Sequence, residues 1–189
     1  MPLLVKGSPR LFPYATIPNF NFKVFKTSLT NRDLTVKMTR GEIRGFENAL
    51  QRAEDCQSSS LEDEQTLISC NLAVRGLNTT FTAQTQGDSL LGTRKTIWVD
   101  VTVRDTVAHF EASAPAGGKG TLRSFVIDHI LLDVQYSRYL SLNEGRRQKF
   151  MEEIADRVKD ELRRIFLNDY NKVLRRAVKS VTFPEESDL

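Results

Sequence analysis

The chain has little of the chemistry that enzymes commonly use. Its 189 residues include only two histidines, His109 and His129, and neither lies near a nucleophile motif. No HExxH, CxxC, phosphate-binding loop or GxGxxG sequence occurs. A metal site made from two histidines and scattered carboxylates is weakly supported, because structural and catalytic sites usually need three or four converging ligands. We therefore expect a protein that is not an enzyme and that needs no cofactor or metal.

Long apolar runs are also absent. No segment approaches the roughly 20 apolar residues of a transmembrane helix, so we expect no membrane span. The opening residues MPLLVKG lack the apolar stretch of a signal peptide, which was then either never present or already removed. A net charge of +3 is too small to indicate a nucleic-acid partner.

Charge is nevertheless uneven along the chain. Residues 1–52 carry nine Lys or Arg against three acidic residues, whereas the next twelve contain five acidic residues and no basic one. These five are Glu54, Asp55, Glu62, Asp63 and Glu64. The pattern indicates a basic end and an acidic tip, although charge runs are most often solvated surface.

The two cysteines suggest an oxidising compartment. Cys56 and Cys70 flank a polar stretch symmetrically, so a hairpin would bring them together as a disulfide. The alternative is a pair of free thiols in a cytosolic protein. Asn78 begins an Asn-Thr-Thr glycosylation sequon. Together these features favour a secreted, glycosylated protein.

A long amphipathic helix is predicted from Glu144 to Val178. Apolar residues recur there about every 3.7 positions, close to the helical period. The spacing Ser141-x-x-Glu144 resembles a capping box that opens the helix. Acidic residues fill its first half and basic residues its second, which complements the helix dipole. An anionic-lipid footprint is the alternative reading of these charges.

Strand-like alternation fills most of the chain before this helix. It covers residues 21–26, 34–56, 66–86, 97–114 and 122–139, and Gly41 and Gly45 suggest a bulge or sharp coiling in the second stretch. The absence of strand–helix alternation predicts antiparallel pairing. We expect an α+β fold in which one strongly coiled antiparallel sheet wraps around the long C-terminal helix. Residues 1–20 are predicted to be an extended proline-rich lead-in, 21–180 a single domain, and 181–189 an acidic tail.

Apolar residues on the helix and sheet are candidates for the lining of a ligand cavity, although simple core packing explains each one separately. On the helix side they are Phe150, Ile154, Val158, Leu162 and Phe166, and on the sheet side Trp98, Phe110, Phe125 and Ile127.

Four parts of the chain share features with a known family: residues 38–46 (MTRGEIRGF), residues 121–125 (TLRSF), the lead-in 14–20 (YATIPNF) and the terminal helix. In these parts the sequence resembles the mite group 7 allergens. Those allergens belong to the tubular lipid-binding superfamily, which includes bactericidal/permeability-increasing protein and the juvenile-hormone-binding and takeout proteins. The resemblance implies a coiled sheet around the helix with an elongated apolar cavity between them. That family usually has a helix before its first strand, and we expect none here because the chain starts too late.

We expect a secreted, arthropod-type protein that binds a lipid or other hydrophobic molecule without chemistry. One alternative is a protein-recognition or immune-modulating module with a filled core, which would bind a protein partner through its surface. Another is a lipopolysaccharide binder, in which basic residues hold phosphates and a pocket holds acyl chains.

Overall fold

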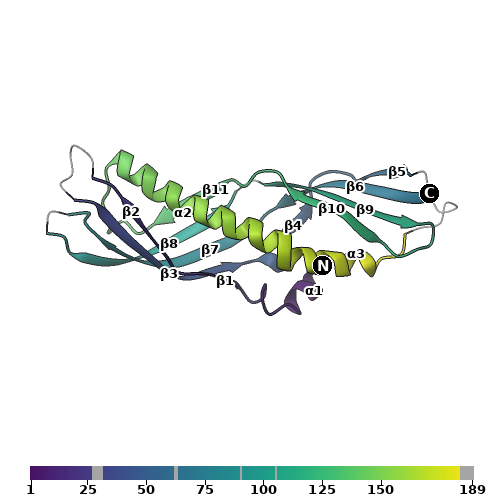
Figure 1. The fold of residues 1–189 in the computed structure, drawn as a ribbon, viewed down its shortest axis with the longest axis horizontal. Coiled ribbons are helices and arrows are strands. Elements are labelled where there is room, and N and C mark those ends of the chain that lie inside the picture. Colours follow the sequence, from purple (N-terminus) through teal and green to yellow (C-terminus); the bar gives the residue numbers. More distant parts are fainter. Residues whose placement is uncertain (27–31, 62–63, 90, 105, 184–189) are drawn as a thin grey trace.

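A long C-terminal helix runs along two antiparallel sheets in the computed structural model (Figure 1). The structure describes residues 1–26, 32–61, 64–89, 91–104 and 106–183. The predicted α+β class is confirmed. In the part of the chain described, no helix combines the length and apolar character that a bilayer crossing needs.

The helix consists of α2 (Glu144–Ile165), a π-helical turn η2 (Phe166–Tyr170) and α3 (Asn171–Lys179). Its bounds agree with the predicted range. The N-cap is Asn143, whose side-chain oxygen accepts a hydrogen bond from the Arg146 backbone N–H at 3.0 Å. The predicted capping box at Ser141 is wrong, because Asn143 sits at the position from which a side chain reaches the third helical N–H.

The strands form two separate antiparallel sheets. Sheet A contains β1 (Ala15–Ile17), β2 (Phe20–Val24), β3 (Leu34–Arg44), β7 (Asn78–Gln86), β8 (Arg94–Val103) and β11 (Leu132–Tyr136). Sheet B contains β4 (Leu50–Arg52), β5 (Gln57–Ser60), β6 (Gln65–Val74), β9 (Val107–Pro115) and β10 (Thr121–Ile127). The strand order is β1-β3-β7-β8-β11 in sheet A, with β2 also on β3, and β10-β9-β6-β4 in sheet B, with β5 also on β6.

Each long strand-like stretch of the sequence is divided between the two sheets. The chain crosses from one sheet to the other between β3 and β4, β6 and β7, β8 and β9, and β10 and β11. The expected single, strongly coiled sheet is therefore replaced by two sheets. Gly45 and Gly76 lie at two of the crossings with φ of 100° and 73°, a conformation that ends a regular strand.

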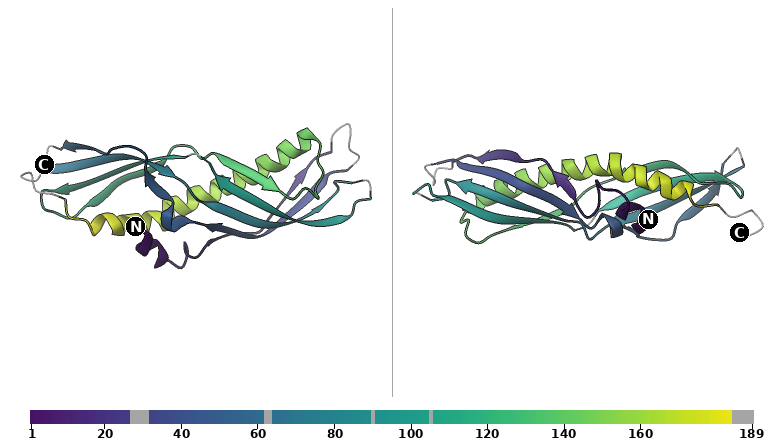
Figure 2. Two further views of the ribbon diagram at one scale, coloured as in Figure 1. Left: turned by 180° about the vertical axis from the view of Figure 1, so that it is seen from behind. Right: turned by 90° about the horizontal axis from the view of Figure 1, so that it is seen from below.

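Backbone hydrogen bonds hold the crossings together at the middle of the molecule. The N–H of Val103 donates to the carbonyl of Leu77 at 3.1 Å, and the N–H of Val74 donates to the carbonyl of Thr106 at 2.9 Å. The helix spans both sheets in all three views (Figures 1 and 2). Its α2 part contacts β2 and β11, and α3 contacts β10.

The predicted bulge in the second strand-like stretch is confirmed. The pairing of β3 with β7 shifts register between Thr39 and Glu42, and Arg40 has a φ of 55°. Gly41 lies within this bulge. A Cβ at Gly41 would be 2.6 Å from the Phe81 ring, so only glycine fits without movement.

The lead-in is more ordered than a purely extended segment. Helix α1 (Pro2–Lys6) precedes the first strand, which corrects the expectation that no helix would do so. It forms because Val5 is fully buried, as is Leu11 after it, and α1 contacts α3 and the 3₁₀ turn η1 (Phe46–Asn48). Of the predicted acidic tail, residues 184–189 lie outside the described residues.

Candidate functional site

The five helix residues predicted to line a cavity face the sheets. Phe150, Ile154, Val158, Leu162 and Phe166 are each no more than 2% exposed. They recur at intervals of four on one side of the helix, so their burial leaves the charged residues on the solvent side.

The aromatic rings among them divide into two clusters. Near the start of α2, Phe150 packs on Phe22 of β2 and Tyr136 of β11, with ring centroids 5.8 and 5.0 Å away. Near its end, Phe166 packs on Phe125 and Tyr170, at 6.3 and 5.0 Å. Phe125 and Phe166, which were both candidates for the cavity lining, therefore lie in contact with each other.

The remaining sheet residues differ in where they lie. Phe110 and Ile127 are half-buried and pack against the edge of the core. Trp98 is 50% exposed, so its predicted place in a common interior is wrong. Its neighbours Ile97 and Val99 are buried, and alternation along a strand places Trp98 on the opposite face.

The interior beside the helix is filled by protein where the two sheets meet. The gap lined by Leu162, Phe166, Val74 and Ile130 has no room for a water molecule. The side chains at these positions pack on one another. That they line a ligand cavity stays a prediction.

An open groove lies instead between the start of α2 and the edge of sheet A. Its volume is about 730 Å³. Strand β11 and Trp98 of the adjacent β8 form one wall, the connection from β11 to α2 forms the end, and the first turns of α2 form the other wall. The lining is Trp98, Val134, Gln135, Tyr136, Arg138, Leu140, Ser141, Leu142, Arg147 and Met151. We call this the α2–β11 groove.

The groove combines an apolar surface with cationic groups. Trp98, Val134, Leu142 and Met151 supply apolar contact area, and Arg147 forms an ion pair with Glu144. Such a groove suits a molecule with a hydrocarbon body and an anionic end.

Tyr136 provides a neutral polar group in this groove. Burial raises the pKa of the Tyr136 hydroxyl above its usual value, which itself already keeps the group protonated at neutral pH. It is therefore available there as a hydrogen-bond donor.

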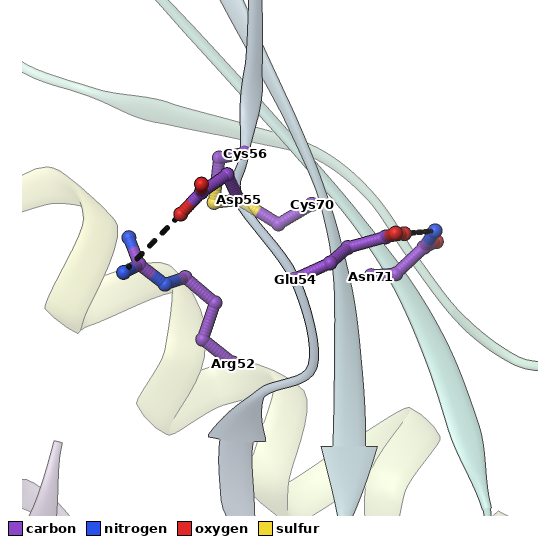
Figure 3. Close-up of a disulfide and its surroundings, with 6 residues drawn as sticks. All are labelled: Arg52, Glu54, Asp55, Cys56, Cys70 and Asn71. Atoms are coloured by element: carbon purple, nitrogen blue, oxygen red, sulfur yellow. Dashed lines mark hydrogen bonds and ion pairs between the residues drawn. A yellow bond between two sulfur atoms is a disulfide. The ribbon is translucent and has the colours of Figure 1, made fainter.

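The predicted disulfide between Cys56 and Cys70 is present (Figure 3). It joins the start of β5 to β6, where Gln57 pairs with Ser69, so the hairpin geometry inferred from the sequence is confirmed. Arg52 and Asp55 form an exposed ion pair beside it at 3.5 Å. Of the predicted acidic tip, residues 62–63 lie outside the described residues.

The histidines lie on exposed surface and do not converge with other ligands. The His109 ring is 2.6 Å from the Asn71 side-chain oxygen, and His129 is beside Asp128. Asn71 in turn donates to Glu54. Within the described residues, no three His, Cys, Asp or Glu side chains are grouped so that they could hold a metal.

The sequon asparagine is exposed at the start of β7. The Asn78 side-chain oxygen accepts a hydrogen bond from Thr102 at 3.4 Å. Glycosylation of Asn78 stays a prediction.

A protein from a tick is closely related to the chain. Over 185 residues, the chain is 43% identical to the salivary anticoagulant protein P23 of Ixodes scapularis, a match that covers 97% of this chain and 83% of that protein. The chain belongs to the P23 family.

Other comparisons give less. No family model matches the chain. The crystal structure of lipopolysaccharide binding protein is 14% identical with a TM-score of 0.47, and the match covers 87% of this chain and 34% of that one. The chain thus spans about a third of that protein's length, and a likeness at this level says nothing about a shared ligand. The resemblance to mite group 7 allergens stays a prediction.

Sequence reasoning missed most of the groove in this member of the P23 family. Trp98 was expected at a ligand site, but Tyr136, Leu142, Arg147 and Met151 were not. Residues 132–142 carried a usable signal, because a short apolar strand joined to a helix by a connection of only seven residues usually lies near the first turns of that helix.

Proposed function

We propose that this protein is a secreted, non-catalytic binder of an amphipathic hydrophobic molecule, which lies in the α2–β11 groove. The observation that carries the proposal is the combination of Trp98, Leu142 and Met151 with Arg147 in one open groove of about 730 Å³. The ligand then lies between the helix and a sheet edge instead of inside a closed tube.

The energetics suit a fatty acid or a similar lipid. Each buried methylene group contributes about 0.8 kcal/mol, so an acyl chain over the apolar wall provides useful affinity without directed bonds. A guanidinium forms strong charge-assisted hydrogen bonds with a carboxylate or phosphate, which gives Arg138 and Arg147 the role of holding the head group.

Secretion is part of the same proposal. The disulfide between Cys56 and Cys70 is of the kind that persists in oxidising compartments, and the P23 relative is named as a salivary protein. Glycosylation at the exposed Asn78 is compatible with that route.

The position of Trp98 makes a direct test possible, since it is the chain's only tryptophan. Titration with a dansyl-labelled undecanoic acid is expected to quench Trp98 fluorescence by energy transfer, with saturation at micromolar concentrations. Unlabelled oleate should reverse the effect by competition.

Matched variants locate the binding. Met151→Glu places a carboxylate on the groove wall and should weaken binding at least tenfold. Val126→Glu makes the same change on an exposed residue of β10 in sheet B and should leave binding unchanged. Absence of saturable quenching in the unmodified protein, or equal losses in both variants, contradicts the proposal.

A second function is favoured by the P23 relationship. We propose that the protein interferes with blood coagulation by binding a protein partner through its surface, as the filled interior beside Leu162 and Phe166 allows. The purified protein should prolong the clotting time of recalcified plasma in a dose-dependent way. An unchanged clotting time at micromolar protein contradicts this second function without affecting the lipid assay. Lipopolysaccharide binding stays a prediction.

A further inference from the structure

A row of polar and cationic side chains crosses the outer face of sheet A, on the side away from α2. Lys23 of β2 pairs with Thr35 of β3, which pairs with Gln86 of β7, which pairs with Arg94 of β8. All four side chains are exposed. Directly opposed residues share a face of the sheet, so the row is continuous over four strands.

A second row runs beside the first and is formed by the residues two positions away on each strand. It consists of Asn21, Lys37, Gln84 and Thr96, which are paired in the same way and are also exposed. Most of these positions line a hollow of about 550 Å³. We call the two rows the outer-face rows. Their strands lie near the end of the molecule where α2 begins (Figure 1).

The charge of this surface has one sign. Lys23, Lys37 and Arg94 line the hollow, and none of the described residues that line it is acidic. Within the described part of the chain, Lys23 and Lys37 form no ion pair. By contrast, the exposed lysines of α2 are paired with carboxylates three residues away, as Lys149 is with Glu152.

Two carboxylates close to the rows in the sequence, two residues before Thr35 and two after Gln86, are engaged with other groups. Asp33 accepts a hydrogen bond from the Lys26 backbone N–H, and the buried Asp88 side chain forms an ion pair with Lys95. The cations of the outer-face rows are therefore not neutralised by these two groups.

The Arg94 side chain is held in place. Its Nε donates to the Gln86 side-chain oxygen at 3.4 Å, and the Gln86 side-chain nitrogen donates to the carbonyl of Gly92 at 2.9 Å. A guanidinium held through Nε still presents its terminal N–H groups, which match the oxygens of a sulfate or phosphate.

The dimensions favour a linear ligand over a single ion. Neighbouring strands lie about 4.8 Å apart, so the rows extend for roughly 14 Å from Lys23 to Arg94. Hydroxyl and amide groups occupy the positions between the cations. Such alternation matches a chain that carries both anionic groups and hydroxyls.

An anionic bilayer fits this surface less well. None of the eight side chains in the rows is apolar. The exposed apolar residues Phe25 and Leu91 lie beyond the strand ends, and Trp98 lies at the margin, two residues past Thr96 on the same face of β8. A membrane contact through the rows themselves would therefore press charged and polar groups against the bilayer. We propose that the outer-face rows bind a sulfated polysaccharide, with Lys23, Lys37 and Arg94 as the sulfate contacts.

Affinity for a heparin-derived octasaccharide tests this proposal, measured by isothermal titration calorimetry at 50 and 150 mM NaCl. The unmodified protein should bind at micromolar concentrations, and more weakly at the higher salt concentration. The triple variant Lys23→Ser, Lys37→Ser, Arg94→Ser should bind at least tenfold more weakly. All three positions are exposed, so its thermal unfolding curve should match that of the unmodified protein.

The control is a triple variant of the helix: Lys149→Ser, Lys172→Ser and Arg175→Ser. It removes the same charge from exposed residues, and Arg175 is held by Asn171 much as Arg94 is held by Gln86. Its affinity should change less than twofold.

Three outcomes of the heparin measurements would overturn the proposal. One is an absence of heparin binding by the unmodified protein, and another is an equal loss in the two triple variants. The third is undiminished binding of fully desulfated heparin.

Binding to vesicles of phosphatidylcholine and phosphatidylserine is measured as a second test. If the outer-face variant lost vesicle binding but kept heparin binding, the surface would be a membrane site instead.

Discussion

The ring of Tyr136 packs edge-on against the ring of Phe150, with centroids 5.0 Å apart. This contact joins the edge strand β11 to α2, and Phe150 also contacts Phe22 on β2. A single helix residue therefore links the helix to two strands of sheet A. The same contact sets the position of Tyr136 in the wall of the α2–β11 groove.

Truncation of Phe150 should be strongly destabilising. Because the side chain is fully buried, Phe150→Ala removes its transfer energy and leaves a cavity, at a cost of about 3–5 kcal/mol in the free energy of unfolding. Chemical denaturation measures this change. Leu167→Ala, at a helix residue that is 64% exposed, is the control and should change stability by no more than about 0.5 kcal/mol. Similar losses in both variants would contradict the packing described here.

Loss of the disulfide should destabilise sheet B. The bond closes a loop between residues 14 positions apart, which corresponds to about 3 kcal/mol in the chain-entropy model. The variant Cys56→Ser, Cys70→Ser should unfold at a lower temperature than the oxidised protein in differential scanning calorimetry. Dithiothreitol should lower the transition of the unmodified protein and leave that of the double variant in place. A transition insensitive to reductant in the unmodified protein would argue against the bond.

The bulge in β3 should not tolerate a side chain at Gly41. A Cβ there lies 2.6 Å from the Phe81 ring and 2.8 Å from the Ile17 Cβ, so Gly41→Ala forces a shift at a cost of about 1–3 kcal/mol. Urea denaturation is the measurement. Gly145→Ala provides a contrast, because a Cβ at this helical position meets nothing within 4 Å. That change should raise stability by up to about 1 kcal/mol, since alanine is the better helix former.

Alkaline pH should destabilise the protein through Tyr170. Burial raises the pKa of Tyr170 in the folded state above the ordinary value of about 10. Below pH ~10 the hydroxyl is protonated in both states, and stability is unaffected by its titration. Above that pH the unfolded chain loses the proton while the folded protein keeps it, so the free energy of unfolding falls as pH rises.

Free energies of unfolding at pH 8, 9.5 and 11 measure this dependence. Tyr170→Phe should reduce the decline, whereas Tyr139→Phe, at a tyrosine that is 82% exposed, should leave it as in the unmodified protein. Part of the decline should persist in Tyr170→Phe, because burial also raises the pKa of Tyr136. Identical pH profiles for all three proteins would contradict the assignment to Tyr170.

Local sequence patterns predicted several features of the fold and part of the candidate site. The apolar period of the helix placed Phe150, Ile154 and Leu162 on one buried face, and the symmetric cysteines indicated the hairpin that brings Cys56 to Cys70. Both features depend on residues close together in the chain. Trp98 lines the α2–β11 groove, but the sequence did not predict that it faces away from the core, because the face on which a strand residue lies depends on which of its neighbours meet the helix.

The sequence by itself determined the long helix, the antiparallel strands and the disulfide, since each follows from local periodicity or from a short loop. Only the tertiary structure decided that every long strand-like stretch divides between two sheets, and that the helix lies across their junction. An alternating pattern continues unchanged through such a crossing, because both sheets bury one face against the same helix. The α2–β11 groove and the outer-face rows likewise exist only through strand pairing, which brings residues such as Lys23 and Arg94 together across 71 positions of chain.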